Sequence, residues 1–363
     1  MTKFRILHIS DPHFCVEPNR KNRIALWREG KQNTLEGFGY TAFRTLKIRN
    51  KKDPEPEKDV LLAQRYFSDF FFSSYRPMVA EQVARFAHFN RNKFDLIICT
   101  GDLATTGLAS DLKQAFNYFV HDPQWGAFLS QKVYDPLNSI GRPLVLMPGN
   151  HDRYRDGTGA AGGRTFDLVF GQFWPTGQKL RVSWEVLQQS DDHLGIIAAD
   201  FSLLTNADVE DSGQRKLNKV LGQGKCHTNV LNELENTTRE LRDLYPNLVI
   251  VWAVHFPPVG IDPDDDLALR ECVLLKNSAT KLNVRVLLAG HLHKKLEHEL
   301  GLGRMLGAGS FCAVDFEGNH WIHLIELDAR SGELVGLSRE DYKFSINERM
   351  FVKDGRQEFF LAS

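Results

Sequence analysis

Cysteine is scarce and scattered in this sequence. No two cysteines have the CxxC spacing of a zinc knuckle or a thioredoxin-like site. The five stand at Cys15, Cys99, Cys226, Cys272 and Cys312. An odd number of dispersed cysteines favours reduced thiols, as in the cytosol.

Long apolar runs are also missing. No segment approaches the roughly 20 apolar residues that a membrane-spanning helix needs. The N-terminal MTKFRILHIS is interrupted by Arg5 and His8, so it lacks the apolar core of a signal peptide. These absences predict a soluble, cytoplasmic protein with no membrane partner.

Neither sign of charge dominates, since 45 Lys and Arg face 46 Asp and Glu, for a formal net charge of −1. This balance excludes a global basic field that would gather nucleic acid or anionic lipid, but it allows local patches. At 363 residues the chain is long enough for one large domain with insertions or for two domains.

Short runs rich in Val, Ile and Leu alternate with helical patterns. The runs predict buried strands at 4–9, 95–100, 143–147, 195–204, 248–254 and 284–289. The helical patterns fall at 77–91, 110–120 with Ser110 as N-cap, 228–245 and 264–282. This alternation predicts α/β layers. After residue 300, alternating segments at 304–314, 320–327 and 333–340 predict antiparallel strands.

Residues 16–75 have the composition of an insertion or cap. Positions 20–52 hold ten Lys or Arg against two Glu. A solvated basic face is the simplest interpretation. A cap over an anionic ligand, a nucleic-acid contact and a dimer surface are the alternatives.

Polar side chains recur directly after the predicted strands, three times beside a glycine. They are Asp11, His13, Asp102, Asn150, His151, Asp152, His255, His291 and His293. Each alone is an ordinary turn residue. Together they predict a site, because ligands gather at the carboxyl ends of strands in open α/β sheets, and imidazole, carboxylate and amide donors suit a metal.

The number of donors favours two ions over one. A single zinc-type ion usually takes three or four protein ligands. This set offers seven without His151, namely Asp11, His13, Asp102, Asn150, His255, His291 and His293. A carboxylate has two oxygens and can hold one ion with each. Asp102 is therefore the expected bridge.

In order, identity and strand context, these residues resemble the motifs of the calcineurin-like metallophosphoesterases. The matching blocks are Asp11-x-His13, Gly101-Asp102, Gly149-Asn150-His151-Asp152, His255 and Gly290-His291-x-His293. The resemblance implies a four-layer αββα sandwich with mixed sheets. It also implies a single domain over 1–363, with the insertion at 16–75 and a strand-rich part at 300–363.

The same resemblance implies a dinuclear centre. Asp11, His13 and His293 would hold one ion, Asn150, His255 and His291 the other, and Asp102 would bridge them. The ions would be iron, manganese, zinc or cobalt. Such a pair lowers the pKa of a bridging water and neutralises charge as that water attacks phosphorus in line.

His151 resembles the family's site histidine, which contacts the phosphate or protonates the leaving group. We expect Asp152 to orient His151 through a hydrogen bond and to raise its pKa. We also expect the glycines at 101, 149 and 290 to allow tight, positive-φ turns beside the ions.

The substrate is indicated by looser similarity. The segments 101–119 and MPGNHDR resemble class III cyclic-nucleotide phosphodiesterases, and Leu103 stands where the purple acid enzymes have a metal-ligating tyrosine. We therefore expect a phosphodiesterase acting on a phosphate ester such as a cyclic nucleotide. A nuclease or phosphomonoesterase is the alternative. A catalytically silent scaffold is disfavoured because every ligand type is present. Oligomeric state stays open.

Overall fold

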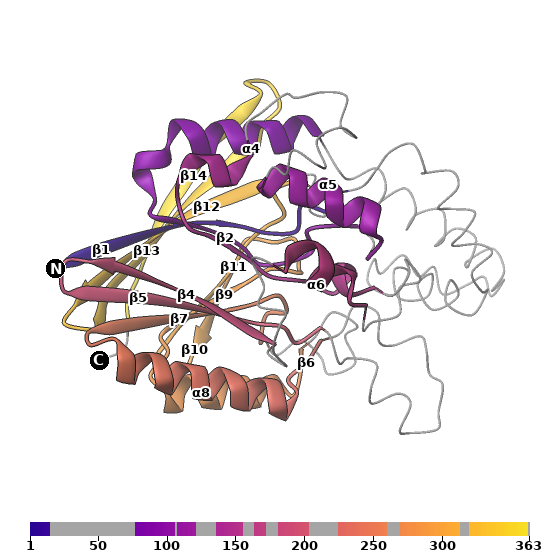
Figure 1. Cartoon of the computed structure of the whole chain (residues 1–363). Coiled ribbons are helices and arrows are strands. Elements are labelled where there is room, and N and C mark those ends of the chain that lie inside the picture. The colour runs from indigo at the N-terminus through magenta and orange to yellow at the C-terminus, as the bar shows by residue number, and fades with distance from the viewer. Residues whose placement is uncertain are drawn as a thin grey trace, which may run out of the picture.

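The computed structural model describes residues 1–14, 77–105, 107–120, 136–154, 163–171, 181–202, 224–259, 269–312 and 319–361. The predicted insertion at 16–75 lies outside the described residues, as does its basic segment at 20–52. Two six-stranded sheets lie face to face, with helices on the outer side of each (Figure 1). This is the predicted four-layer αββα arrangement.

The first sheet joins the N-terminal strands to the C-terminal ones. Its order is β14-β13-β12-β1-β2-β3. The strands are β1 Thr2–Ile9, β2 Leu96–Cys99, β3 Leu144–Leu146, β12 Trp321–Arg330, β13 Glu333–Ser345 and β14 Met350–Phe359. β1, β2 and β3 are parallel, whereas β12 pairs antiparallel with β1 and continues into an antiparallel β12-β13-β14 meander. The sheet is therefore mixed, and the expected C-terminal antiparallel strands are confirmed.

The second sheet has a parallel centre and antiparallel edges. Its order is β10-β11-β9-β7-β5-β4. The strands are β4 Val182–Gln189, β5 Asp192–Ala199, β7 Leu248–Val254, β9 Val286–Ala289, β10 Leu296–Leu300 and β11 Gly303–Gly307. β5, β7, β9 and β11 run parallel to one another, whereas the edge strands β4 and β10 pair antiparallel with β5 and β11. Two short strands, β6 Gly224–Lys225 and β8 Leu269–Arg270, pair separately.

The helices are divided between the two outer faces. α4 Pro77–Phe89, α5 Ala109–Phe119 and α6 Thr165–Phe170 pack in the core that contains the first sheet and the space between the sheets. α8 Thr228–Leu244 and α9 Cys272–Lys281 cover the outer face of the second sheet. Figure 1 shows α4 and α5 on one side of the sheets and α8 on the other. The short 3-10 helices are η2 Arg91–Lys93, η4 Leu137–Ile140 and η5 His151–Arg153.

The apolar run of β7 illustrates why these strands have no polar face. Val249, Val251 and Ala253 belong to the core between the sheets. Ile250 and Trp252 alternate with them and pack in the core under α8. Because side chains alternate across a strand, both faces must be apolar in a sheet that is covered on both sides.

Most predicted elements are confirmed. The strands β4, β6, β10 and β14 and the helix α6 were not predicted, and two helices begin differently from the prediction. β4 was not predicted because it is an edge strand in which polar residues, namely Ser183, Glu185, Gln188 and Gln189, interrupt the apolar run. The helix predicted over 264–282 begins only at Cys272, and Leu269–Arg270 are extended as β8. The N-cap of α5 is Leu108 rather than Ser110, because the first helical hydrogen bonds run to the carbonyl of Leu108.

No helix in the described part of the chain is both long and apolar enough to cross a membrane.

Candidate metal centre

The nine predicted site residues meet in one place. They follow β1, β2, β3, β7 and β9, so both sheets contribute to the site. All nine are at most 8% exposed. Burying this many imidazole and carboxylate groups is unfavourable unless they are paired or bind a metal.

The backbone at this site is held in a rarely adopted conformation. Five predicted ligands have left-handed φ values, namely Asp11 (53°), His13 (51°), Asp102 (52°), His291 (71°) and His293 (51°). Each such non-glycine residue costs about 1–3 kcal/mol, and strain of this kind collects at functional sites. The backbone conformation of these loops is therefore locally unfavourable, and it directs the five side chains into the site.

The neighbouring glycines serve mainly to leave space. Of the three glycines predicted to adopt positive φ, only Gly101 does so, at 105°, and that part of the prediction is wrong for Gly149 and Gly290. A Cβ on Gly149 would lie 2.8 Å from Cγ of Asp102, and one on Gly290 would lie 2.8 Å from Oδ2 of Asp11. Both glycines therefore let a loop approach a carboxylate closely.

One cluster of donors combines Asp11, His13 and His293. Nε2 of His13 lies 2.9 Å from Nε2 of His293, which lies 3.5 Å from Oδ1 of Asp11. The main-chain N–H of His291 donates to the Asp11 carboxylate and fixes its direction. Two imidazole nitrogens and one carboxylate oxygen thus face a common point.

The second cluster is centred on His255. Its Nε2 atom lies 3.0 Å from Oδ1 of Asn150, 3.2 Å from Nδ1 of His291 and 3.3 Å from Oδ2 of Asp102. Its Nδ1 atom lies 2.8 Å from the carbonyl oxygen of Thr100 and must donate its hydrogen there. In the neutral ring, Nε2 then carries a lone pair.

That lone pair determines what the cluster can hold. A nitrogen lone pair, an amide oxygen and a carboxylate oxygen repel one another unless a cation lies between them. A proton can take this place. Burial lowers the pKa of His255, but the charges of Asp102 and Asp11 outweigh burial and raise that pKa to about 9. A metal ion satisfies all the donors at once, so the residues fit a metal.

Asp102 lies between the two clusters. Its Oδ2 atom is 3.6 Å from Nε2 of His13 and 3.3 Å from Nε2 of His255. Its Oδ1 atom accepts the main-chain N–H of His151 at 2.9 Å. One carboxylate oxygen was expected to hold each ion, but in the structure the same oxygen, Oδ2, faces both clusters. Burial alone would raise the pKa of Asp102, yet His255, His151 and His13 hold it well below its usual value.

The family model for calcineurin-like phosphoesterases matches residues 4–295, which include every predicted ligand. The chain belongs to the calcineurin-like phosphoesterases. A comparison with curated protein sequences finds no match.

Solved structures of this phosphoesterase fold are similar at low sequence identity. A dimetal phosphatase from Danio rerio superposes with a TM-score of 0.53 at 9% identity, covering 96% of this chain and 98% of its own. GAP50, the anchor in the inner membrane complex of Plasmodium, gives a TM-score of 0.51 at 10% identity, covering 100% and 90%. At such identities the likeness concerns the fold alone.

The fifth histidine of this phosphoesterase site, His151, lies at the edge of both clusters. Its Nε2 atom is 4.0 Å from Oδ2 of Asp102, and its Nδ1 atom is 2.8 Å from the carbonyl oxygen of Thr105. The ring meets that of His13 edge-on, with centroids 4.8 Å apart. Burial lowers the pKa of His151, although Asp102 opposes this effect. The neutral ring therefore directs Nε2 toward the site.

The predicted role of Asp152 is wrong. Its Oδ2 atom accepts the main-chain N–H groups of Leu103 and Gly149, both at 2.9 Å, and its Oδ1 atom accepts that of Ala104 at 2.8 Å. The orienting bond to His151 comes instead from the Thr105 carbonyl. Burial, helped by Asp102, raises the pKa of Asp152 to about 7. Asp152 thus fastens the loop after β2 to the loop after β3.

Two supporting residues were missed from the sequence. Tyr154 is buried directly behind the motif, and its hydroxyl lies 3.0 Å from Nδ2 of Asn150. Asp200 follows β5 and forms an ion pair with the buried Arg153. Asp200 directly follows β5, but the strand predicted at 195–204 ran past it, so the strand-end pattern did not mark Asp200. Tyr154 carries no such signal.

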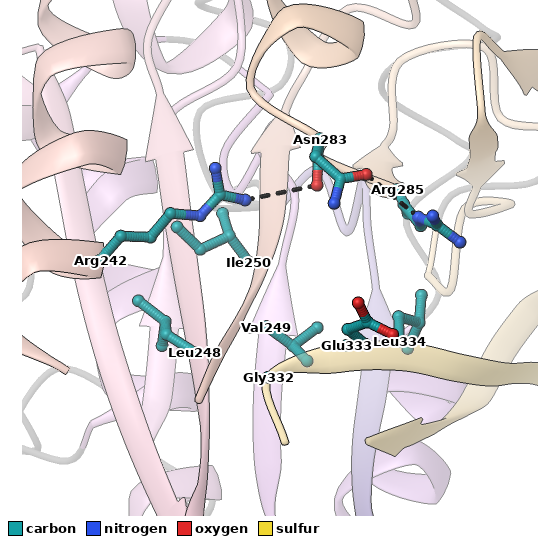
Figure 2. Close-up of a pocket in the computed structure, with 9 residues that line it drawn as sticks. All are labelled: Arg242, Leu248, Val249, Ile250, Asn283, Arg285, Gly332, Glu333 and Leu334. Atoms are coloured by element: carbon teal, nitrogen blue, oxygen red, sulfur yellow. Dashed lines mark hydrogen bonds between the residues drawn. The ribbon is translucent and has the colours of Figure 1, made fainter. Parts of the chain in front are cut away.

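A separate cavity of about 120 Å³ lies at the opposite end of the strands (Figure 2). It is lined by Arg242, Leu248, Val249, Ile250, Asn283, Arg285, Gly332, Glu333 and Leu334. Arg242 donates to the main-chain carbonyls of Leu282 and Asn283, and Arg285 to the side-chain oxygen of Asn283. The bonds from Arg242 satisfy main-chain carbonyls directly after α9, and the bond from Arg285 holds the side chain of Asn283. The arginines of this cavity therefore serve the fold.

Proposed function

We propose that this phosphoesterase hydrolyses phosphodiester bonds with two metal ions. The observation that carries the proposal is the position of Asp102, with one carboxylate oxygen within 3.6 Å of an imidazole nitrogen in each cluster. Asp11, His13 and His293 would hold one ion, and Asn150, His255 and His291 the other. Two bound ions supply an activated water and charge neutralisation for displacement at phosphorus.

The protein's own groups then bind and orient the ester. As an imidazolium, His151 would contact the phosphate or give its Nε2 proton to the leaving oxygen, while the Thr105 carbonyl accepts its Nδ1–H. The Asp102 carboxylate and the negative charge of the bound ester would favour this protonated ring. The loops after β2 and β3 keep their relative position through Asp152. We propose His151 as the catalytic residue and Asp152 as a positioning residue.

The ion pairs of Arg153 favour a diester over a monoester as the substrate. A monoester phosphate carries up to two negative charges and a diester only one, so a monoesterase gains more from an arginine at the site. Arg153 follows the Asn-His-Asp motif directly, but its guanidinium is committed to Asp200 and Asp167 at 2.8 Å each. Cyclic nucleotides are the diesters that we propose first. The basic segment 20–52, which would support a nuclease, lies outside the described residues.

A substrate panel tests the proposal. The chain is supplied in turn with iron, manganese, zinc or cobalt and assayed on bis(p-nitrophenyl) phosphate, p-nitrophenyl phosphate, cyclic AMP, cyclic GMP, 2′,3′-cyclic nucleotides and single-stranded DNA. We expect metal-dependent hydrolysis of diesters above monoesters, and loss of both metal binding and turnover in Asp102→Asn. Absence of turnover with every metal and ester would overturn the proposal. Preferred cleavage of DNA with steep salt dependence would instead support a nuclease.

We further propose that residues 1–363 form one cytoplasmic domain. β12, which follows the residues matched by the family model, pairs with β1 along its length and so completes the first sheet. Cys99, Cys226, Cys272 and Cys312 are free thiols, which suits a reducing compartment.

A further inference from the structure

Asn150 is anchored by a residue outside the metal-binding motif. Nδ2 of Asn150 donates a hydrogen bond to the hydroxyl of Tyr154 at 3.0 Å. Tyr154 is 2% exposed, so this bond is shielded from water. The same amide turns its Oδ1 toward His255, 3.0 Å from Nε2.

The direction of this amide matters for any cation. The oxygen and the NH2 group of an asparagine side chain have nearly the same shape, but only the oxygen is a metal ligand. A flipped amide would direct its NH2 group at the site and repel the ion. An acceptor placed on the Nδ2 side therefore favours the orientation that binds metal, as outer partners do for ligating histidines.

The position of Tyr154 is itself fixed on several sides. Its ring lies 4.6 Å from the ring of His151. A Cβ added at Gly107 or at Gly163 would collide with the carbonyl group of Tyr154, so both glycines pack closely against it. The main-chain N–H of Gly163 also donates to the carbonyl of Arg153, directly before it. The hydroxyl thus has a fixed location from which to hold Asn150.

We propose that Tyr154 is a positioning residue that orients Asn150 for metal binding in the cluster with His255 and His291. The inference rests on the proposed function, because it concerns one of the two proposed ions. It assigns to Tyr154 an effect on metal affinity that is distinct from its contribution to packing.

Removal of one hydroxyl tests this role. In Tyr154→Phe the ring remains, and calorimetric titration with Mn²⁺ should show one ion bound as in the wild type and the other bound about 10- to 100-fold more weakly. Tyr118→Phe is the matched control, because Tyr118 is equally buried and its hydroxyl donates to the carbonyl of Ala80 in α4. This control should bind both ions normally.

The variant Asn150→Asp separates orientation from packing. Both ends of a carboxylate are oxygen, so the direction of the side chain no longer matters, and adding Tyr154→Phe to Asn150→Asp should cost little further Mn²⁺ affinity. An equal loss in both backgrounds, or unchanged binding in Tyr154→Phe, would overturn the role of Tyr154. A wild-type chain that binds no Mn²⁺, zinc, iron or cobalt would overturn the metal site itself, and the two failures are therefore distinguishable.

Discussion

Arg153 and Asp200 form a buried ion pair that joins the loops of the two sheets. Nε and Nη2 of Arg153 lie 2.9 Å and 2.8 Å from Oδ2 of Asp200, and both residues are 1% exposed. Arg153 follows the motif after β3 in the first sheet, and Asp200 follows β5 in the second. The pair therefore holds together the two halves from which the site is built.

Removing one partner of this pair should destabilise the protein strongly. In Arg153→Met the carboxylate of Asp200 stays buried without its cation, and the free energy of unfolding should fall by about 3–5 kcal/mol. Adding Asp200→Asn removes the unpaired charge and should recover a large part of the loss. Urea denaturation of the two single variants and the double variant measures this, and strictly additive losses would contradict the coupling.

Filling the space at Gly149 should disturb both ions. The added Cβ of Gly149→Ala would lie 2.8 Å from Cγ of Asp102 and would displace the carboxylate that lies between the clusters. We expect affinity for both metals to fall by about 100-fold, the upper range for displaced supporting groups. Gly355→Ala is the control, because its Cβ would meet no atom within 4 Å. Normal binding of two ions by Gly149→Ala, measured by metal analysis after dialysis, would contradict the bridging role of Asp102.

Away from the site, Asp341 should make stability depend on acid pH. Burial alone would raise the pKa of Asp341, but a hydrogen bond from His323 and the charges of Arg339 and Lys295 hold it at about 2. A carboxyl whose pKa is lower in the folded chain contributes stability above its unfolded pKa, near 4, and loses it as the pH falls toward 2. With solvent screening the contribution is about 1 kcal/mol.

Comparison with Asp341→Asn isolates this effect from other acid-sensitive groups. The asparagine can still accept from His323, but it does not titrate. The wild type should exceed the variant in unfolding free energy at pH 5, and the difference should shrink between pH 4 and pH 2. A difference that stays constant over this range would show that the pKa of Asp341 is not lowered by folding.

The positions of the site residues could be predicted because each lies in a short local motif after a strand. Asp11, Asp102 and His255 follow apolar runs that alternate with helices, and the carboxyl ends of such strands meet. Which side chain accepts hydrogen bonds from main-chain N–H groups could not be predicted from such motifs. Asp152 bonds to the N–H groups of Leu103, Ala104 and Gly149, and any residue type could supply those N–H groups.

The orientation of side chains was likewise beyond the sequence. Nothing in the string Asn150-His151-Asp152-Arg153-Tyr154 indicates that its last residue holds its first, because this depends on the turn of η5. β4 was missed for a related reason. β4 pairs with a neighbour on one side only and is partly exposed to solvent. Polar residues are therefore tolerated along it, and its sequence lacks the apolar run of a central strand.

Replacing His151 should separate metal binding from catalysis. Its ring nitrogen Nε2 lies 4.0 Å from Oδ2 of Asp102, and its Nδ1 donates to the Thr105 carbonyl and not to a proposed ligand. We therefore expect His151→Ala to retain two ions by metal analysis while kcat falls by about 10²- to 10⁴-fold, the range for a general acid.

The size of this loss in kcat should depend on the ester. A p-nitrophenolate leaving group departs without a proton, whereas an alkoxide leaving group must be protonated by a general acid. A fall of equal size for bis(p-nitrophenyl) phosphate and for a cyclic nucleotide would assign His151 to phosphate contact rather than to proton transfer. Loss of an ion would make it a ligand.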